Sequence, residues 1–236
     1  MHSPSRRALL RAAVLVPPAS VLPAAVFRSA KAQTRAAERP VLRYFTEAEY
    51  AFVDAAVARL IPADDLGPGA REARVPEFID GQLAGSYGSA ETWYMQGPWR
   101  SGVPEQGYQL KLTPAALYRA AIRDIDEHVR SAGKAQSFAQ LPAEEQDAFL
   151  HTLEDGKVSL PNADAKTFFS MLWDNTKEGF LADPMYGGNR DFVGWKLIGF
   201  PGPRYNYVAE IEQHGKRYTM PIVGIEGRSG RPVREA

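Results

Sequence analysis

The chain has 236 residues, enough for one well-packed core or two small domains, and its apolar (44%) and charged (24%) fractions are those of an ordinary globular protein. It contains no cysteine, so this chain offers no disulfide, thiolate nucleophile, iron–sulfur ligand or covalent haem attachment. The formal net charge is zero and the four histidines form no close pair, so the sequence supports neither nucleic-acid binding nor an ordinary zinc site.

Residues 1–32 have the features of an export signal. They contain five basic residues and no acidic one, and Arg6 and Arg7 stand in a stretch, SRRALLR, that resembles a twin-arginine signature. The uncharged run that follows is too short for a bilayer span and is interrupted by prolines, which favours a signal peptide over a transmembrane helix. Paired arginines also occur by chance, but here an apolar run and a cleavage sequence follow them. We therefore expect export in the folded state to the periplasmic face of the inner membrane.

The expected cleavage site lies between Ala32 and Gln33, because the sequence AKA places small residues at the spacing that signal peptidase requires. A polar linker is predicted over residues 33–44. It leads into a single helical domain over residues 45–207, which is followed by a C-terminal extension over residues 208–236.

The domain begins with two predicted helices. Thr46 and Glu49 form a capping-box pattern, and apolar residues at helical spacing continue to Ile61, after which Pro62 ends the helix. A second helix is predicted over residues 70–83.

Asp64 and Asp65 lie in the loop between these two helices. Their carboxylates could hold a metal ion. Acidic residues in such a position more often fix a turn and cap the next helix, and we prefer that interpretation.

Residues 84–112 are predicted to be a long loop in which aromatic rings stand among glycines and prolines. Trp93, Tyr94, Trp99 and Tyr108 offer flat apolar faces of the kind that stack on pyranose rings. The same rings could instead fasten the loop to the body of the domain or contact a partner protein. The fastening role is preferred, and the other two remain open.

Two further helices follow this loop. Thr113 is the predicted cap of a helix over residues 113–133, whose charged residues, Asp124 among them, are predicted to form a solvated face. A shorter helix is predicted after Pro142. Its His151 lies close in sequence to several acidic residues, so an acid–base role is conceivable, but a solvated surface helix is the simpler interpretation.

Residues 167–207 carry the densest pattern in the chain. They begin as a helix whose apolar arc is wide enough to pack on two sides, and Asn175 and Thr176 fall within that arc. A buried polar group needs a partner or costs about 1–3 kcal/mol, so we expect these two side chains to bind loop amides near Gly187 and Gly188.

Beyond this helix the backbone is rich in glycine, proline and aromatic residues, which predicts irregular structure that must pack on its own domain or on a partner. Some of these rings are expected to pack on the helix and others to face a partner. The predicted partner-facing residues are Tyr186, Phe192, Trp195 and Phe200, with Trp93 and Trp99 from the earlier loop.

Three motifs in this stretch, FF..L, T.EGFLADP.YGGN and GW..IGFPGP, resemble the gluconate 2-dehydrogenase subunit 3 family. The resemblance extends from about Phe45 to Tyr207. It implies an accessory small subunit of a membrane-bound, flavin-dependent dehydrogenase that oxidises gluconate or another sugar acid, sugar or polyol. It also implies that this chain has no catalytic residue and holds no cofactor or metal, because FAD and haem c belong to a large flavoprotein and a multihaem cytochrome c partner. The signal on this chain would then export the flavoprotein as well.

Two alternatives remain from the residues themselves. Asp174, Glu178 and Asp183 could act as paired carboxylates of a glycosidase, although Lys177 lies between the first two on a polar helix face and favours a solvated surface. A free-standing periplasmic sugar-binding protein could use the tryptophans.

The predicted fold is mainly α, a single irregular helical domain of about five helices with long aromatic, glycine- and proline-rich loops. In the C-terminal extension, residues 208–222 could form a small hairpin about His214 and Gly215. The Gly/Arg-rich end from Gly224 is expected to be disordered.

Overall fold

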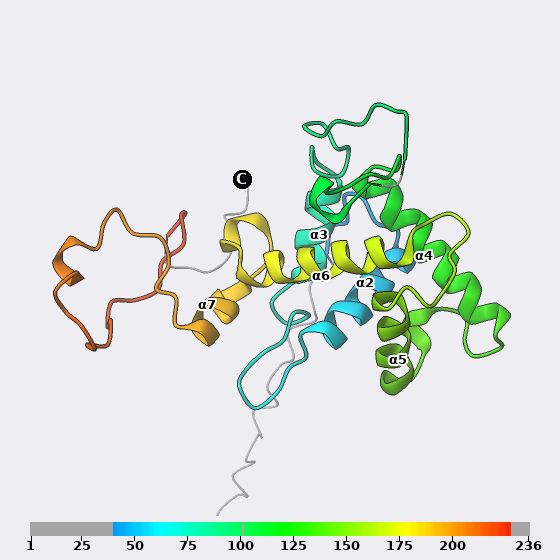
Figure 1. Cartoon of the computed structure of the whole chain (residues 1–236). Helices are drawn as coiled ribbons and strands as arrows, with labels where there is room; N and C mark the ends of the chain where they lie inside the picture. The colour runs from blue at the N-terminus through cyan, green and yellow to red at the C-terminus, as the bar shows by residue number, and fades with distance from the viewer. Residues whose placement is uncertain (1–39, 101, 228–236) are drawn as a thin grey trace, which may run out of the picture. The chain divides into compact units, whose positions relative to one another are not determined.

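The computed structural model describes residues 40–100 and 102–227 (Figure 1). These residues contain six α-helices and no β-strand. The mainly α prediction is therefore confirmed, with one more helix than expected. These residues belong to one unit that begins at Pro40. The predicted export arginines Arg6 and Arg7, the cleavage site at Ala32 and Gln33, and most of the linker lie outside the described residues.

The helices are joined by loops and short 3-10 turns. Their bounds are α2 Glu47–Leu60, α3 Val75–Leu83, α4 Pro114–Ser131, α5 Ala143–Glu154, α6 Ala165–Leu181 and α7 Val193–Ile198. The 3-10 turns are Pro104–Gln106, Phe138–Gln140, Pro184–Tyr186, Arg190–Phe192 and Val208–Glu210.

Helix α2 begins with the predicted capping box. Glu49 N donates to Thr46 Oγ1 at 3.3 Å, and Thr46 N donates to Glu49 Oε2 at 2.8 Å, so two amides at the helix start are satisfied reciprocally. Glu49 also pairs with Arg119 of α4 at 2.9 Å. The helix ends at Leu60, two residues before the proline that was expected to stop it.

Helix α3 begins at Val75, five residues later than predicted. Arg74 immediately before it has φ of 64°, a left-handed conformation that interrupts any helix from residue 70. In the loop before α3, Asp64 Oδ1 accepts from Leu66 N at 2.8 Å and so fixes a turn, as expected. Asp64 does not cap α3. Asp65 is exposed.

A buried carboxylate on α3 fastens the segment that enters the domain. Asp80 is only 2% exposed and accepts three backbone amides, from Arg43 at 2.7 Å, Tyr44 at 3.0 Å and Phe45 at 2.8 Å. Such charge-assisted bonds are stronger than neutral ones, so this single side chain holds the residues just before α2 against α3.

Helix α4 has the predicted cap, with Ala116 N donating to Thr113 Oγ1 at 3.3 Å. The prediction that Asp124 belongs to a solvated face is wrong. Asp124 is buried, and it accepts from Asn162 N at 2.6 Å and from Asn162 Nδ2 at 3.0 Å. It therefore holds the loop that leads into α6. On α5, His151 is exposed, with Nδ1 3.2 Å from Glu154, as expected of a surface helix.

Helix α6 is the centre of the fold and packs against α2, α3, α4, α5 and α7 (Figure 1). Phe168 and Leu172 are fully buried on it, and Phe168 meets Tyr118 of α4 edge to face at 5.3 Å between ring centroids. The wide apolar arc read from the sequence is thus explained by neighbours on several sides.

The two polar residues of the α6 arc, Asn175 and Thr176, are buried as predicted but have other partners than expected. Asn175 donates to Tyr118 Oη at 3.0 Å and accepts from Tyr87 Oη at 3.1 Å, which links three elements. Thr176 Oγ1 donates to Leu172 O at 2.6 Å within the helix. The prediction that these side chains bind amides near Gly187 and Gly188 is wrong.

The hairpin predicted over residues 208–222 is also wrong. The structure has a 3-10 turn at Val208–Glu210 and irregular backbone elsewhere in this region. Contacts at the base of the loop hold it instead, where Tyr207 Oη donates to Gly202 O at 2.9 Å and Arg204 donates to Pro221 O.

Candidate functional site

The residues after α6, Asp183 to Tyr207, form what we call the aromatic segment. It starts with Asp183, whose Oδ1 accepts from Met185 N at 3.0 Å and whose Oδ2 accepts from Ile225 N at 2.7 Å. One carboxylate therefore starts the 3-10 turn Pro184–Tyr186 and also holds the C-terminal extension against the end of α6.

The aromatic segment folds back over the C-terminal end of α6 and satisfies carbonyl groups that a helix end leaves without partners. Asn189 is fully buried, with φ of 46°; its Nδ2 donates to Ala182 O at 2.8 Å and its Oδ1 accepts from Gly194 N at 2.8 Å. The Trp195 indole nitrogen donates to Leu181 O at 2.7 Å.

Two glycines permit this close approach. A Cβ at Gly188 would lie 2.1 Å from Gly179 O, and a Cβ at Gly194 would lie 2.0 Å from Phe180 O. Any larger residue would push the segment off the helix. The motif YGGN with its following GW therefore has a structural explanation, in which the glycines allow contact while Asn189 and Trp195 supply the hydrogen bonds.

The rings of the aromatic segment divide into buried and exposed ones. Phe192 and Trp195 stack with 5.3 Å between centroids, and Phe200 meets Trp195 edge to face at 4.9 Å. Phe192 is 5% and Trp195 4% exposed, whereas Phe200 is 39% and Tyr186 52% exposed. Of the four rings of this segment predicted to face a partner, two are covered by this chain and two remain open to solvent.

Exposed apolar side chains gather in this part of the molecule. Eleven of the sixteen large apolar side chains that are exposed in the described residues lie between Leu181 and Ile225. They include Leu197 and Ile198 of α7, beside Phe200 in sequence. Soluble monomers rarely expose much contiguous apolar surface unless it contacts something, so this region is the best candidate for a protein interface.

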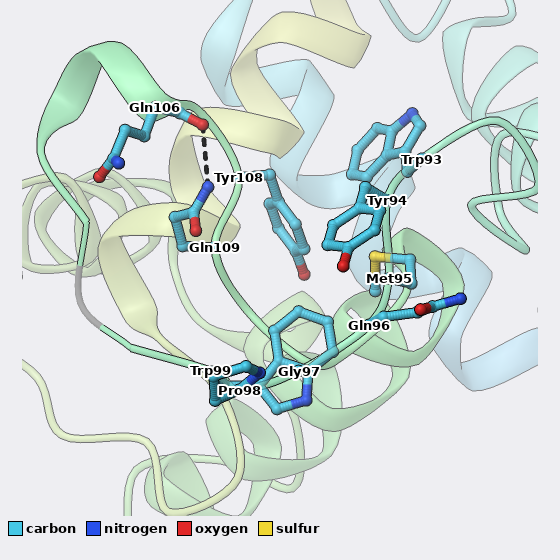
Figure 2. Close-up of a pocket in the computed structure, with 10 residues that line it drawn as sticks. All are labelled: Trp93, Tyr94, Met95, Gln96, Gly97, Pro98, Trp99, Gln106, Tyr108 and Gln109. Carbon is cyan, nitrogen blue, oxygen red and sulfur yellow. Dashed lines mark hydrogen bonds between the residues drawn. The ribbon is translucent and has the colours of Figure 1, made fainter.

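The other two predicted partner residues, Trp93 and Trp99, lie together elsewhere. Both line a pocket formed by the loop between α3 and α4, where Trp93 is half-buried and Trp99 exposed (Figure 2). The rings of this loop stand out in the sequence, whereas its glutamines do not, because an isolated glutamine carries no recognisable pattern.

The three acidic residues considered as paired carboxylates take part in different interactions. Asp174 pairs with Lys177 at 2.9 Å, and Lys177 also lies over the Trp173 ring at 5.2 Å. Burial raises the pKa of Glu178, and nearby Asp174 adds to the rise. Asp183 is occupied with backbone amides, so these contacts favour structural roles over a glycosidase pair.

Within residues 40–100 and 102–227, no three histidine or acidic side chains lie close enough to hold a metal ion together. In the same ranges no helix has both the length and the apolar character needed to cross a membrane.

Comparison with known proteins gives one match. The family model described as gluconate 2-dehydrogenase subunit 3 matches residues 47–202, which include all six helices and most of the aromatic segment. No curated protein and no solved structure matches the chain significantly.

Proposed function

The chain belongs to the gluconate 2-dehydrogenase subunit 3 family, and we propose that it is the non-catalytic small subunit of an exported, membrane-associated, FAD-dependent dehydrogenase complex. In this proposal the complex oxidises gluconate or a related sugar acid, sugar or polyol. FAD is on a large flavoprotein subunit, haem c is on a cytochrome subunit, and this chain stabilises the flavoprotein.

The observation that carries the proposal is the apolar surface around Tyr186, Phe200 and α7. Beneath it, Trp195 and Asn189 fix the aromatic segment to the end of α6 through hydrogen bonds of 2.7 and 2.8 Å. The exposed rings are thus presented on a rigid base, and a surface that is ordered before binding loses less conformational entropy when a partner covers it.

We predict that Tyr186→Ala and Phe200→Ala weaken the complex while largely preserving the fold. Aromatic rings at the centre of an interface often contribute 2 kcal/mol or more, which corresponds to about a thirtyfold loss of affinity. Phe200→Ala should lower the free energy of unfolding by about 1 kcal/mol. The ring is partly exposed, and its removal mainly eliminates the edge-to-face contact with Trp195. Thermal melting of the subunit and co-purification of a FAD-containing partner would measure the two effects.

A matched control is Tyr94→Ala, which removes an equally large and mostly exposed ring from the loop between α3 and α4. It should leave assembly unchanged. If Tyr94→Ala disrupts the complex and the other two variants do not, the interface lies on that loop. If tagged wild-type chain brings down no flavoprotein, the proposed function is wrong.

Export is the second part of the proposal and rests on Arg6 and Arg7. The route's receptor recognises both guanidinium groups, and lysine lacks their planar fork of donors. Changing both residues to lysine should therefore retain this chain in the cytoplasm together with the flavoprotein. Cell fractionation followed by immunoblotting of both subunits measures this; a flavoprotein that still reaches the periplasm at normal levels must carry a signal of its own.

A further inference from the structure

The loop between α3 and α4 forms a pocket of about 560 Å³ that is open to solvent on one side, a volume within the usual range of small-molecule sites (Figure 2). The residues that carry its chemistry all come from positions 93–109 of this loop: Trp93, Tyr94, Trp99, Tyr108, Gln106 and Gln109. Four are aromatic and two are amides; a third amide, that of Gln96, also lines the pocket. The pocket lies apart from the aromatic segment, so nothing in the proposed interface accounts for it.

One wall of this loop pocket is rigid before any ligand binds. The Trp93 ring packs between Tyr87, 5.8 Å away, and Tyr108, 5.1 Å away, edge to face with both. Tyr108 Oη donates to Leu112 O at 2.6 Å, and burial raises the pKa of Tyr108 to about 12, so its hydroxyl remains protonated. A wall held in this way gives a ligand a fixed surface at little entropic cost.

The opposite side of the pocket has rings that are exposed to solvent. Tyr94 is 80% and Trp99 40% exposed, although burying such rings would be favourable. Figure 2 shows the hydroxyl groups of Tyr94 and Tyr108 directed toward the side of the pocket where Trp99 lies. Flat apolar faces therefore stand next to two hydroxyl groups. That of Tyr94 can donate and accept, whereas that of Tyr108 can only accept, because its proton is donated to Leu112 O.

Gln109 adds an oriented amide to this arrangement. Its Nε2 donates to Gln106 O at 2.9 Å, which fixes the side chain, and its Oε1 accepts no hydrogen bond from the described residues. Gln106 accepts from Val103 N at 2.8 Å and so stabilises the turn that places Gln109. The pocket thus keeps an amide oxygen available as an acceptor beside the rings.

None of the residues that line the loop pocket is charged. A sugar acid would require a cation such as an arginine fork for its carboxylate, and the lining supplies none. Ring faces combined with hydroxyl and amide groups instead match a neutral pyranose, which has an apolar C–H face and equatorial hydroxyls. A hollow formed by a single loop also suits one or two sugar rings better than an extended peptide, which needs a groove along its length.

We propose that the loop pocket is a binding site for a neutral saccharide, with a sugar ring stacked on Trp99 and Tyr94 and its hydroxyls bound by Gln109, Tyr94 and Tyr108. This site is independent of the assembly proposed above. Through it this chain binds a neutral sugar, whichever substrate the proposed complex oxidises.

The test compares methyl β-D-glucopyranoside and cellobiose with methyl β-D-glucuronide, which has the same ring but carries a carboxylate. Saturation-transfer NMR and calorimetry on the full chain should show binding of both neutral sugars, and binding of the glucuronide at least tenfold weaker. Trp99→Ala and Gln109→Ala should each weaken neutral-sugar binding at least tenfold. Gln109→Ala should leave the melting temperature unchanged, and Trp99→Ala, whose ring is 40% exposed, should cost no more stability than Phe200→Ala does. Tyr186→Ala, which removes an exposed ring outside the pocket, is the matched control and should bind as wild type does.

Three results would overturn the proposal: no binding of either neutral sugar, equal binding of the glucuronide, or binding that neither pocket variant affects. If a co-purified flavoprotein shields Trp99 from acrylamide quenching while no sugar binds, the loop is a protein interface instead. None of these results decides whether the complex assembles, which the Phe200 and Tyr186 variants report.

Discussion

Replacing Trp195 by alanine should lower the free energy of unfolding by about 3–5 kcal/mol, the usual cost of removing a large buried ring. The ring is 4% exposed, stacks on Phe192 and meets Phe200, so its removal leaves a cavity with two orphaned neighbours. It also leaves Leu181 O without its hydrogen bond at the end of α6. Chemical denaturation of the purified chain, followed by circular dichroism, would measure the loss.

Trp195→Phe separates the two contributions, because it keeps a ring but lacks the indole donor. We expect it to cost about 1 kcal/mol, because the Leu181 carbonyl is only part-buried and the lost hydrogen bond is replaced in part by water. Tyr186→Ala, which removes an exposed ring of the same segment, should cost less than about 0.5 kcal/mol. If Trp195→Ala has the same denaturation midpoint as the wild type, the packing of the aromatic segment on the end of α6 does not contribute to stability as described.

Replacing Asp80 by alanine should destabilise the domain by about 2–3 kcal/mol, since a buried donor left unsatisfied, here the Phe45 amide, costs about 1–3 kcal/mol and two part-buried amides lose their acceptor as well. Three amides, those of Arg43, Tyr44 and Phe45, lose their acceptor together. We expect protease sensitivity to increase first near residue 43, ahead of α2, and limited proteolysis with mass spectrometry would locate the cut.

Asp80→Asn is the conservative variant and keeps the volume of the side chain. It retains one acceptor oxygen but loses the charge and places an amide donor against backbone donors, so an intermediate cost is expected. Asp174→Ala, at an exposed ion pair with Lys177, should change stability by about 1 kcal/mol or less. Equal effects of Asp80→Ala and Asp174→Ala would show that Asp80 does not hold the entering segment.

The sequence predicted those elements whose signals are local. The start of α2 followed from Thr46 and Glu49, three residues apart, and the start of α4 followed from Thr113. The start of α3 could not be predicted in this way. It depends on the left-handed conformation of Arg74 and on Ala70 N donating to Ile61 O at 2.8 Å, and neither leaves a mark in nearby residues.

The hydrogen-bond partners of buried polar groups could not be predicted from the sequence. Asp124 fits a polar stripe on its own helix, but its partner Asn162 is 38 residues away. Asn175 was correctly placed inside, yet Tyr118 and Tyr87 come from other elements and cannot be identified from helical periodicity.

The same limit applies to the candidate sites. Sequence alone predicted that rings of the aromatic segment would divide between core and surface, but it placed Trp195 together with Phe200 among the partner-facing rings, whereas Trp195 is 4% and Phe200 39% exposed. This division depends on how closely Gly188 and Gly194 approach the backbone of α6, which is a property of the folded chain.

The anchoring of residues 43–45 on Asp80 has a mechanical consequence. All three amides bind one carboxylate, so tension applied through the N-terminal segment is resisted by three adjacent hydrogen bonds to the same side chain. The force is transmitted through Asp80 to the middle of α3 before it reaches α2, so the first turn of α2 carries less of the load. A domain pulled from its N-terminal end would therefore resist unfolding at residues 43–45.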